Sequence, residues 1–134
     1  MSQENVEIVR QGWDAWLRGD LPALLGTFDP EVVWDTSHFR DWPESAYHGR
    51  EGVERFLSEW LDVWDEYRVD LEDVIEVQDG RVVSVFRHRG KGRDSGVPMD
   101  LKMANIVTLR EGKITRLDNY DTPGEALEAV GLSE

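Results

Sequence analysis

Cysteine is absent from the sequence, and so is any apolar run approaching the roughly 18 residues that a membrane-spanning helix needs. Without cysteine the chain has no disulfide, no thiol nucleophile and no thiolate metal site, which is typical of proteins of the reducing cytosol. The segment from Met1 to Arg10 also lacks the apolar core of a secretion signal. We therefore expect a cytoplasmic protein that does not cross a membrane.

Positive charge is also scarce. Lysine and arginine together number 15 against 28 aspartates and glutamates, which gives a formal net charge of −13 at pH 7. A surface that binds nucleic acid or an anionic membrane needs clustered cations. The charge balance therefore argues against both as partners.

What the chain does contain is enough apolar material for one folded domain. It has 134 residues, 40% of them hydrophobic, and six tryptophans. A chain of this length buries about two-thirds of its unfolded surface, and disordered chains seldom carry so much aromatic area. No linker-like segment divides the chain, so we expect a single domain over residues 1–134.

Apolar residues at helical spacing predict three helices in the first half of the chain, over residues 2–18, 21–28 and 50–67, and a short one over 123–130. Asp20 and Thr122 are the expected caps of the two short helices, each followed by a proline in the first turn. The clearest stripe is that of the third helix, which consists of Val53, Phe56, Leu57, Trp60, Leu61 and Trp64.

From residue 68 the apolar period changes to two, which predicts strands over residues 68–78, 81–92, 97–109 and 113–121, after a shorter one at 31–36. Long strands with enough helices to cover only one face predict an α+β fold. We expect a cone-shaped, strongly curved antiparallel or mixed sheet wrapped around the three helices of the N-terminal half.

The turns between the strands predict which side chains share the concave face. Pairing residue 92 with residue 97, and residue 109 with residue 113, gives the same alternation on all three strands. The shared face then holds the apolar residues Val82, Phe86, Leu101, Met103, Val107 and Leu117, and the polar residues His88, Asn105, Asn119 and Asp121.

Four polar side chains on an apolar face indicate a polar-lined cavity rather than a packed core, because an unpaired buried polar group costs about 1–3 kcal/mol. The alternative is a register error, since a slip of one residue would send all four side chains to solvent. His88 and Asp121 flank Leu101 in this pairing, so His88 can act as acid or base with Asp121 orienting or charging it. The expected apolar and polar wall of the cavity consists of Trp13, Trp34, Trp60, Phe86, Met103, Leu117 and Asn119.

The order of elements resembles the nuclear transport factor 2-like superfamily, and within it the SnoaL-like and ketosteroid-isomerase-like branch. The stretches that carry the resemblance are Arg18-Gly19-Asp20-Leu21, Asp29-Pro30-Glu31-Val32, Tyr47-His48-Gly49-Arg50-Glu51-Gly52-Val53, Gly112-Lys113-Ile114 and Glu125-Ala126-Leu127-Glu128-Ala129. The resemblance implies a cystatin-like α+β barrel. It also implies a homodimer formed through the convex sheet face, where Arg87, Arg116, Asp118 and Tyr120 would lie.

The resemblance also implies site residues. Asp35 matches the general base of ketosteroid isomerase, and Asn105 falls at the position of its oxyanion-binding acid, where an amide can also donate a hydrogen bond. The tyrosine donor of the isomerase aligns with Gly12. The histidine and aspartate of SnoaL-type cyclases fall at Asn105 and Asn119, and an asparagine cannot shuttle a proton.

The expected function is the binding of a small apolar or aromatic molecule, with proton transfer next to its carbonyl group. Asp35 or Asp121 would be the base, and His88, Asn105 and Asn119 would stabilise the developing charge. No organic cofactor is implied, and the histidines lack metal-ligand spacing, so we expect no metal. Two alternatives stay open: a non-catalytic ligand-binding module, and a hydrolase or dehydratase that activates a water molecule in the pocket.

Overall fold

The computed structural model describes residues 2–40 and 42–132. Four helices and six strands follow one another in the order α1 (Ser2–Leu17), α2 (Leu21–Gly26), β1 (Phe28–Asp35), β2 (Ala46–His48), α3 (Gly49–Val63), β3 (Trp64–Val77), β4 (Arg81–Gly92), β5 (Pro98–Arg110), β6 (Lys113–Tyr120) and α4 (Pro123–Ala129). Among the described residues, no helix has both the length and the apolar composition that a membrane span requires.

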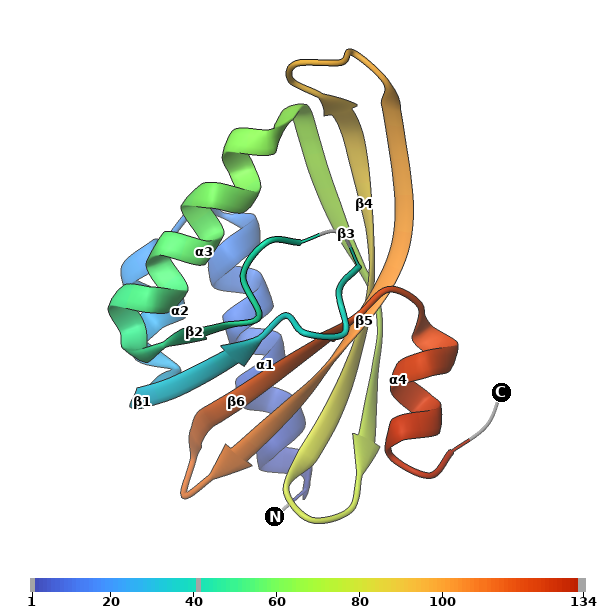
Figure 1. Cartoon of the computed structure of the whole chain (residues 1–134). Coiled ribbons are helices and arrows are strands. Elements are labelled where there is room, and N and C mark those ends of the chain that lie inside the picture. The colour runs from blue at the N-terminus through green and yellow to red at the C-terminus, as the bar shows by residue number, and fades with distance from the viewer. Residues whose placement is uncertain (1, 41, 133–134) are drawn as a thin grey trace.

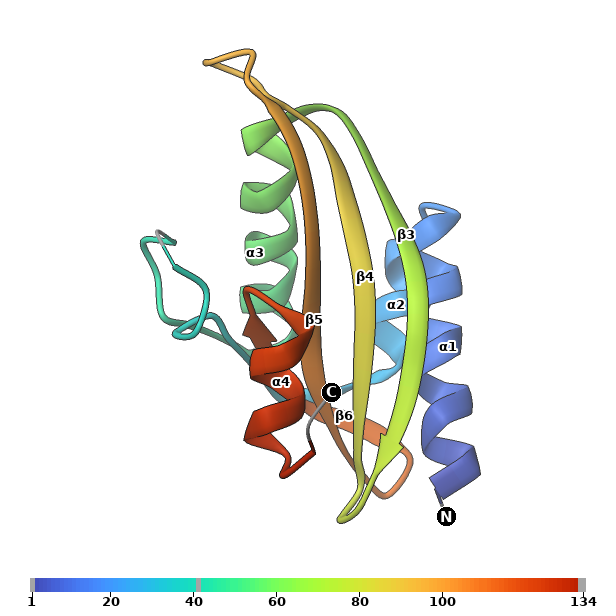
Figure 2. The same ribbon diagram turned by 90° about the vertical axis from the view of Figure 1, so that its right-hand side faces the viewer.

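All six strands form one curved sheet in the order β2-β1-β6-β5-β4-β3 (Figure 1). Strand β1 runs parallel to β6, and the other neighbouring strands are antiparallel. Helices α1, α2 and α3 lie on the concave side of the sheet, whereas α4 packs on the opposite side (Figures 1 and 2). The predicted α+β cone with a mixed sheet is therefore confirmed.

The short helices begin where the sequence places their caps. The Asp20 carboxylate accepts a hydrogen bond from the Ala23 amide at 3.1 Å, and the Thr122 hydroxyl accepts one from the Glu125 amide at 3.2 Å. Each side chain satisfies an amide that has no partner inside its own helix. Gly19, with φ of +76°, follows α1 in the left-handed conformation that ends a helix.

Two predicted boundaries were wrong in the same way. Helix α3 ends at Val63, so Trp64 and Tyr67 belong to β3 rather than to the helix. Likewise, Phe28 opens β1 instead of closing α2. In both places an apolar residue that continues the helical stripe is also the first residue of the next strand, and tertiary packing decides between the two.

The strand registers are right in one hairpin and shifted in the next. Strands β4 and β5 pair as predicted, with His88 opposite Leu101. Between β5 and β6 the turn is one residue tighter than predicted and a bulge follows at Thr108 and Leu109, so Asn105 faces Asn119 instead of Leu117. Two shifts of one residue preserve the alternation, which is why the concave face still holds His88, Asn105 and Asn119 as predicted.

The convex face is divided between an apolar patch and a charged one. Helix α4 covers the apolar patch, which consists of Val83, Val85, Ala104 and Ile106, and it packs on them through its buried Ala126. Beyond it, Arg87 pairs with Glu72 at 3.2 Å and with Asp100 at 2.9 Å. The homodimer expected through this face stays a prediction.

Candidate functional site

Between the concave face of the sheet and the helices on it lies a cavity of about 90 Å³. The twenty residues at its wall are Val9, Gly12, Trp13, Trp16, Leu24, Phe28, Trp34, Phe39, Phe56, Leu57, Trp60, Tyr67, Phe86, His88, Met103, Asn105, Val107, Ile114, Leu117 and Asn119. All seven residues that the sequence assigned to the pocket wall are among them.

Nine of the twenty wall residues are phenylalanine, tryptophan or tyrosine. The ring centroids of Trp13 and Phe86 lie 5.0 Å apart, and those of Trp34 and Phe56 are also 5.0 Å apart. Alternation along β1 turns Trp34 inward, and the helical stripe of α1 does the same for Trp13. Such a wall suits a flat apolar molecule, which gains both burial and ring contacts.

A row of three polar side chains crosses the concave face. Ser84 on β4 lies opposite Asn105 on β5, which lies opposite Asn119 on β6. All three are buried, and within the described part of the chain Ser84 Oγ, Asn105 Oδ1 and Asn119 Oδ1 have no hydrogen-bond partner. Since Asn105 and Asn119 line the cavity, their amide oxygens are acceptors available to a bound molecule.

A titratable pair stands at another part of the wall. The Tyr67 hydroxyl and His88 Nδ1 are joined by a hydrogen bond of 2.6 Å. Burial lowers the pKa of His88 to about 4, so the ring is neutral at pH 7, and burial raises the pKa of Tyr67. With Nδ1 engaged by Tyr67, the ring nitrogen left for a bound molecule is Nε2.

Asp35 does not lie in the cavity, contrary to the sequence-based expectation. Trp34 pairs with Leu117 and faces inward, so the next residue, Asp35, faces outward beside Asp118. Its carboxylate accepts hydrogen bonds from Ser37 and, at 2.7 Å, from Arg116. Burial raises the pKa of Asp35, but the Ser37 hydrogen bonds and the Arg116 charge outweigh it and hold the pKa below its ordinary value. These surroundings are those of a structural carboxylate.

Asp121 is also absent from the cavity wall, and it does not pair with His88. Strand β6 ends at Tyr120, one residue before Asp121. The Asp121 carboxylate instead accepts a hydrogen bond from the Arg40 amide and forms an ion pair with its guanidinium, both at 3.3 Å. The predicted His88–Asp121 pair is therefore wrong, and Tyr67 occupies the place beside His88.

Tyr67 and Phe39 are wall residues that the sequence analysis missed. Tyr67 was assigned to the end of a helix, although the alternation Tyr67, Val69, Leu71 continues β3 toward its N-terminus. Phe39 lies on the segment between β1 and β2, where no periodicity exists to place a side chain.

The twenty wall residues include no aspartate, glutamate, lysine or arginine. Throughout the described ranges, no three His, Cys, Asp or Glu side chains come together as a metal site requires. With His88 neutral at pH 7, the cavity presents hydrogen-bonding groups but no net charge. It is suited to an uncharged guest, because a charged one would lose its hydration without gaining a counter-ion.

Comparison with known proteins agrees with this geometry. The family model described as the SnoaL-like domain matches residues 9–117. The chain is 30% identical over 126 residues to an uncharacterized protein of Mycobacterium tuberculosis, covering 93% of this chain and 94% of that protein.

Two solved structures share the architecture. Bal32a, from a soil-derived mobile gene cassette, superposes with a TM-score of 0.80 at 22% identity, covering 96% of this chain and 97% of the other. A putative polyketide cyclase from Xanthomonas campestris superposes with a TM-score of 0.72 at 25% identity, covering 96% and 98%.

Proposed function

Starting from the fact that the chain belongs to the SnoaL-like family of the nuclear transport factor 2-like superfamily, we propose that it binds a small, uncharged aromatic molecule that carries a hydroxyl or carbonyl group. The guest occupies the cavity on the concave face of the sheet. Its ring lies among the tryptophans, and its polar group meets the amides of Asn105 and Asn119.

The observation that carries this proposal is the pair of unpaired amide oxygens. Asn105 is 3% exposed and Asn119 is 5% exposed, yet neither Oδ1 has a partner among the described residues. Two leucines at these positions would pack the same face without that cost. An amide also has donors beside its acceptor, so either amide can hydrogen-bond a hydroxyl or a carbonyl group.

Three probes that share the naphthalene ring test the parts of the proposal one at a time. Naphthalene tests the aromatic wall, 2-naphthol adds a hydroxyl group and 2-naphthoate adds a charge. We expect 2-naphthol to bind roughly fivefold or more tightly than naphthalene, as one hydrogen bond of about 1 kcal/mol provides. We expect 2-naphthoate to bind at least about tenfold more weakly than 2-naphthol, because its carboxylate finds no cation.

The variant that tests the role of the amides is Asn105→Leu, and the matched control on the convex face is Arg87→Gln. Quenching of tryptophan fluorescence gives each dissociation constant. The preference for 2-naphthol over naphthalene should shrink toward one in Asn105→Leu and persist in Arg87→Gln. Equal binding of both probes to the unchanged protein, or tighter binding of 2-naphthoate, would contradict the proposal.

The Tyr67–His88 pair favours one catalytic function as a second candidate. In it, the carbon next to the carbonyl group of the guest loses its proton to His88 Nε2, an amide of Asn105 or Asn119 stabilises the enolate oxygen, and the proton then returns to carbon. This step needs no carboxylate in the cavity. It also fits the name of the Xanthomonas campestris protein as a putative polyketide cyclase.

Exchange of the α-protons of 2-tetralone in D₂O, followed by NMR, tests this second function. The protein should accelerate exchange over buffer, and His88→Gln should abolish the acceleration while 2-naphthol still binds. Binding of 2-tetralone without faster exchange would leave the protein as a binding module.

A further inference from the structure

The cavity wall has one part that belongs to neither a helix nor a strand. Nineteen of the twenty wall residues described lie in such elements, and the remaining one is Phe39. It belongs to the segment between β1 and β2, here called the cap segment and made of residues 36–40 and 42–45. A guest can enter or leave the cavity here without breaking a hydrogen bond of a helix or strand.

The cap segment covers the cavity with two aromatic side chains. Phe39 stacks on Trp42 with ring centroids 5.5 Å apart and planes 8° from parallel, and Phe39 lies 5.5 Å from Trp60. Trp42 in turn lies 5.7 Å from Trp60 and 5.7 Å from Phe56, both on α3. The cap segment is therefore seated on the cavity residues of that helix.

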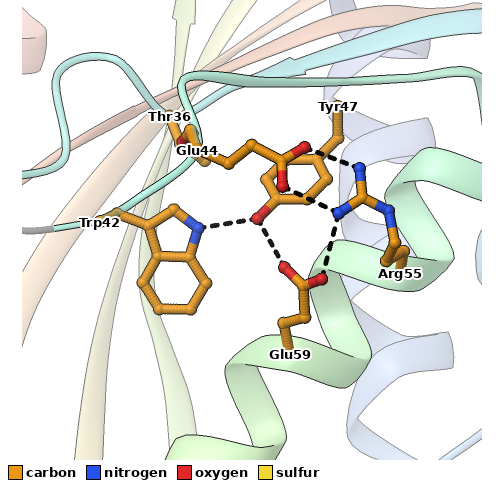
Figure 3. A network of polar contacts seen from close by, with 6 residues as sticks. All are labelled: Thr36, Trp42, Glu44, Tyr47, Arg55 and Glu59. Carbon is orange, nitrogen blue, oxygen red and sulfur yellow. Dashed lines mark hydrogen bonds and ion pairs between the residues drawn. The ribbon is translucent and has the colours of Figure 1, made fainter.

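A polar network joins the cap segment to α3 (Figure 3). Trp42 Nε1 donates to the Tyr47 hydroxyl at 2.9 Å, and that hydroxyl donates to Glu59 at 2.7 Å. Arg55 donates to both carboxylate oxygens of Glu44, at 2.9 and 2.7 Å, and to Glu59 at 3.1 Å. We call these five residues the clasp.

The clasp combines a fixed part with a breakable one. The Tyr47 side chain is fully buried, and Thr36 holds the base of the cap segment through its amide, which donates to the Ser45 carbonyl at 2.9 Å. The ion pairs are exposed, by contrast, since the side chains of Arg55, Glu44 and Glu59 are 50%, 44% and 42% accessible. Water and salt compete for such pairs, so they can open while the buried base stays in place.

We propose that the clasp holds the cap segment closed over the cavity, and that Arg55 sets how fast a guest is taken up and released. The part about the guest rests on the proposed function of the cavity. Arg55 does not line the cavity, so it is a positioning residue that acts through Glu44 and Glu59. Its loss changes the rates of binding more than the affinity, because the guest meets the same wall once the cap segment has closed.

The test compares Arg55→Met with Arg89→Met. Arg89 on β4 is a matched control: it is 42% accessible and forms ion pairs with Asp70 at 3.5 Å and Asp100 at 3.8 Å, away from the cap segment. Stopped-flow fluorescence measures the association and dissociation of 2-naphthol. In Arg55→Met both rates should rise together by roughly three- to tenfold, as expected for losing two exposed ion pairs, while the dissociation constant changes by less than about threefold. Arg89→Met should leave both rates unchanged.

A measurement without a guest separates this proposal from the proposed function. Acrylamide, a neutral quencher, should reach the cavity tryptophans more readily in Arg55→Met than in the unchanged protein or in Arg89→Met. If quenching rises but 2-naphthol binds to no variant, the clasp still holds the cap segment and the proposed function is wrong. If neither quenching nor the rates respond to Arg55→Met, or if Arg89→Met has the same effect, the clasp proposal is overturned.

Discussion

The two faces of the central strands differ in how their polar side chains are paired. On the convex face, β4 carries Arg87 and Arg89, and each guanidinium meets a carboxylate on a neighbouring strand. On the concave face the same strand carries Ser84, which is buried and whose Oγ has no hydrogen-bond partner among the described residues. Neighbouring residues of one strand therefore differ in whether the protein itself supplies their partners.

This difference supports the proposal that the concave face binds a ligand. The charges of Arg87 and Arg89 are matched within the chain, so they leave little for a ligand to recognise. The concave acceptors of Asn105 and Asn119 have no partner within the described residues, and both side chains line the cavity. An unpaired buried polar group is costly, and a ligand that hydrogen-bonds to it offsets that cost.

The largest expected effect comes from placing a charge on the concave face. Asn105→Asp should lower the free energy of unfolding at pH 7 by about 4 kcal/mol, because the carboxylate is buried without a cation. The loss should shrink as the pH falls and the carboxyl group becomes neutral, which urea unfolding at pH 7 and pH 5 checks. An equal loss at both pH values would show that the variant fails for steric reasons instead.

His88 should give the next largest effect, as a dependence of stability on pH. Burial lowers its pKa from 6.5 to about 4, so the unfolded chain binds the proton more readily than the folded one. This contribution to the free energy of unfolding is complete above pH 6.5 and is lost as the pH falls to about 4, by roughly 3 kcal/mol. The stability difference between the protein and His88→Gln should therefore change across this window. A constant difference would mean that the ring is not held neutral.

Asn119→Leu should have a smaller effect of the opposite sign. Replacing an amide whose oxygen is unpaired by an apolar side chain should raise the free energy of unfolding by about 1 kcal/mol. The same variant should lose preference for 2-naphthol over naphthalene, so stability and recognition move in opposite directions. Thermal unfolding and probe titration on one sample measure both, and a destabilised variant with intact preference would argue against a binding role for Asn119.

The smallest effect is expected on the convex face. Arg87→Gln removes ion pairs to Glu72 and Asp100, but all three side chains reach solvent. We expect a loss of about 0.5 kcal/mol or less, with probe binding unchanged. If Arg87→Gln lowered the free energy of unfolding as much as Asn105→Asp does, the two faces would not differ in the way described.

The sequence predicted the sheet and the inward face, but not how the strands end. Alternation along β4, β5 and β6 identified His88, Asn105 and Asn119 as inward residues, because parity survives a pair of one-residue shifts. Asp121 lies beyond the end of β6, where alternation no longer applies. Asp35 was placed through a family resemblance, although the inward position of Trp34 beside it turns it outward.

Irregular backbone accounts for the remaining errors. Glu66 has a φ of +54° at a bulge in β3, next to the point where the chain changes from helix to strand. The apolar helical pattern of the third predicted helix continues through Trp64, so it does not indicate this change. The contact of Tyr67 with His88 was missed for that reason. The clasp joins residues between β1 and β2 to α3 through side chains alone, and no periodic pattern in the sequence indicates it.

A crystal structure of the protein with 2-naphthol bound tests the binding role of the cavity most directly. The ring should lie in the cavity between α1, α3 and the sheet. Its hydroxyl oxygen should lie about 2.7–3.2 Å from an amide atom of Asn105 or Asn119. A probe bound only on the outer surface, or one whose hydroxyl group points away from both amides, would contradict the claim that these side chains are kept for a guest.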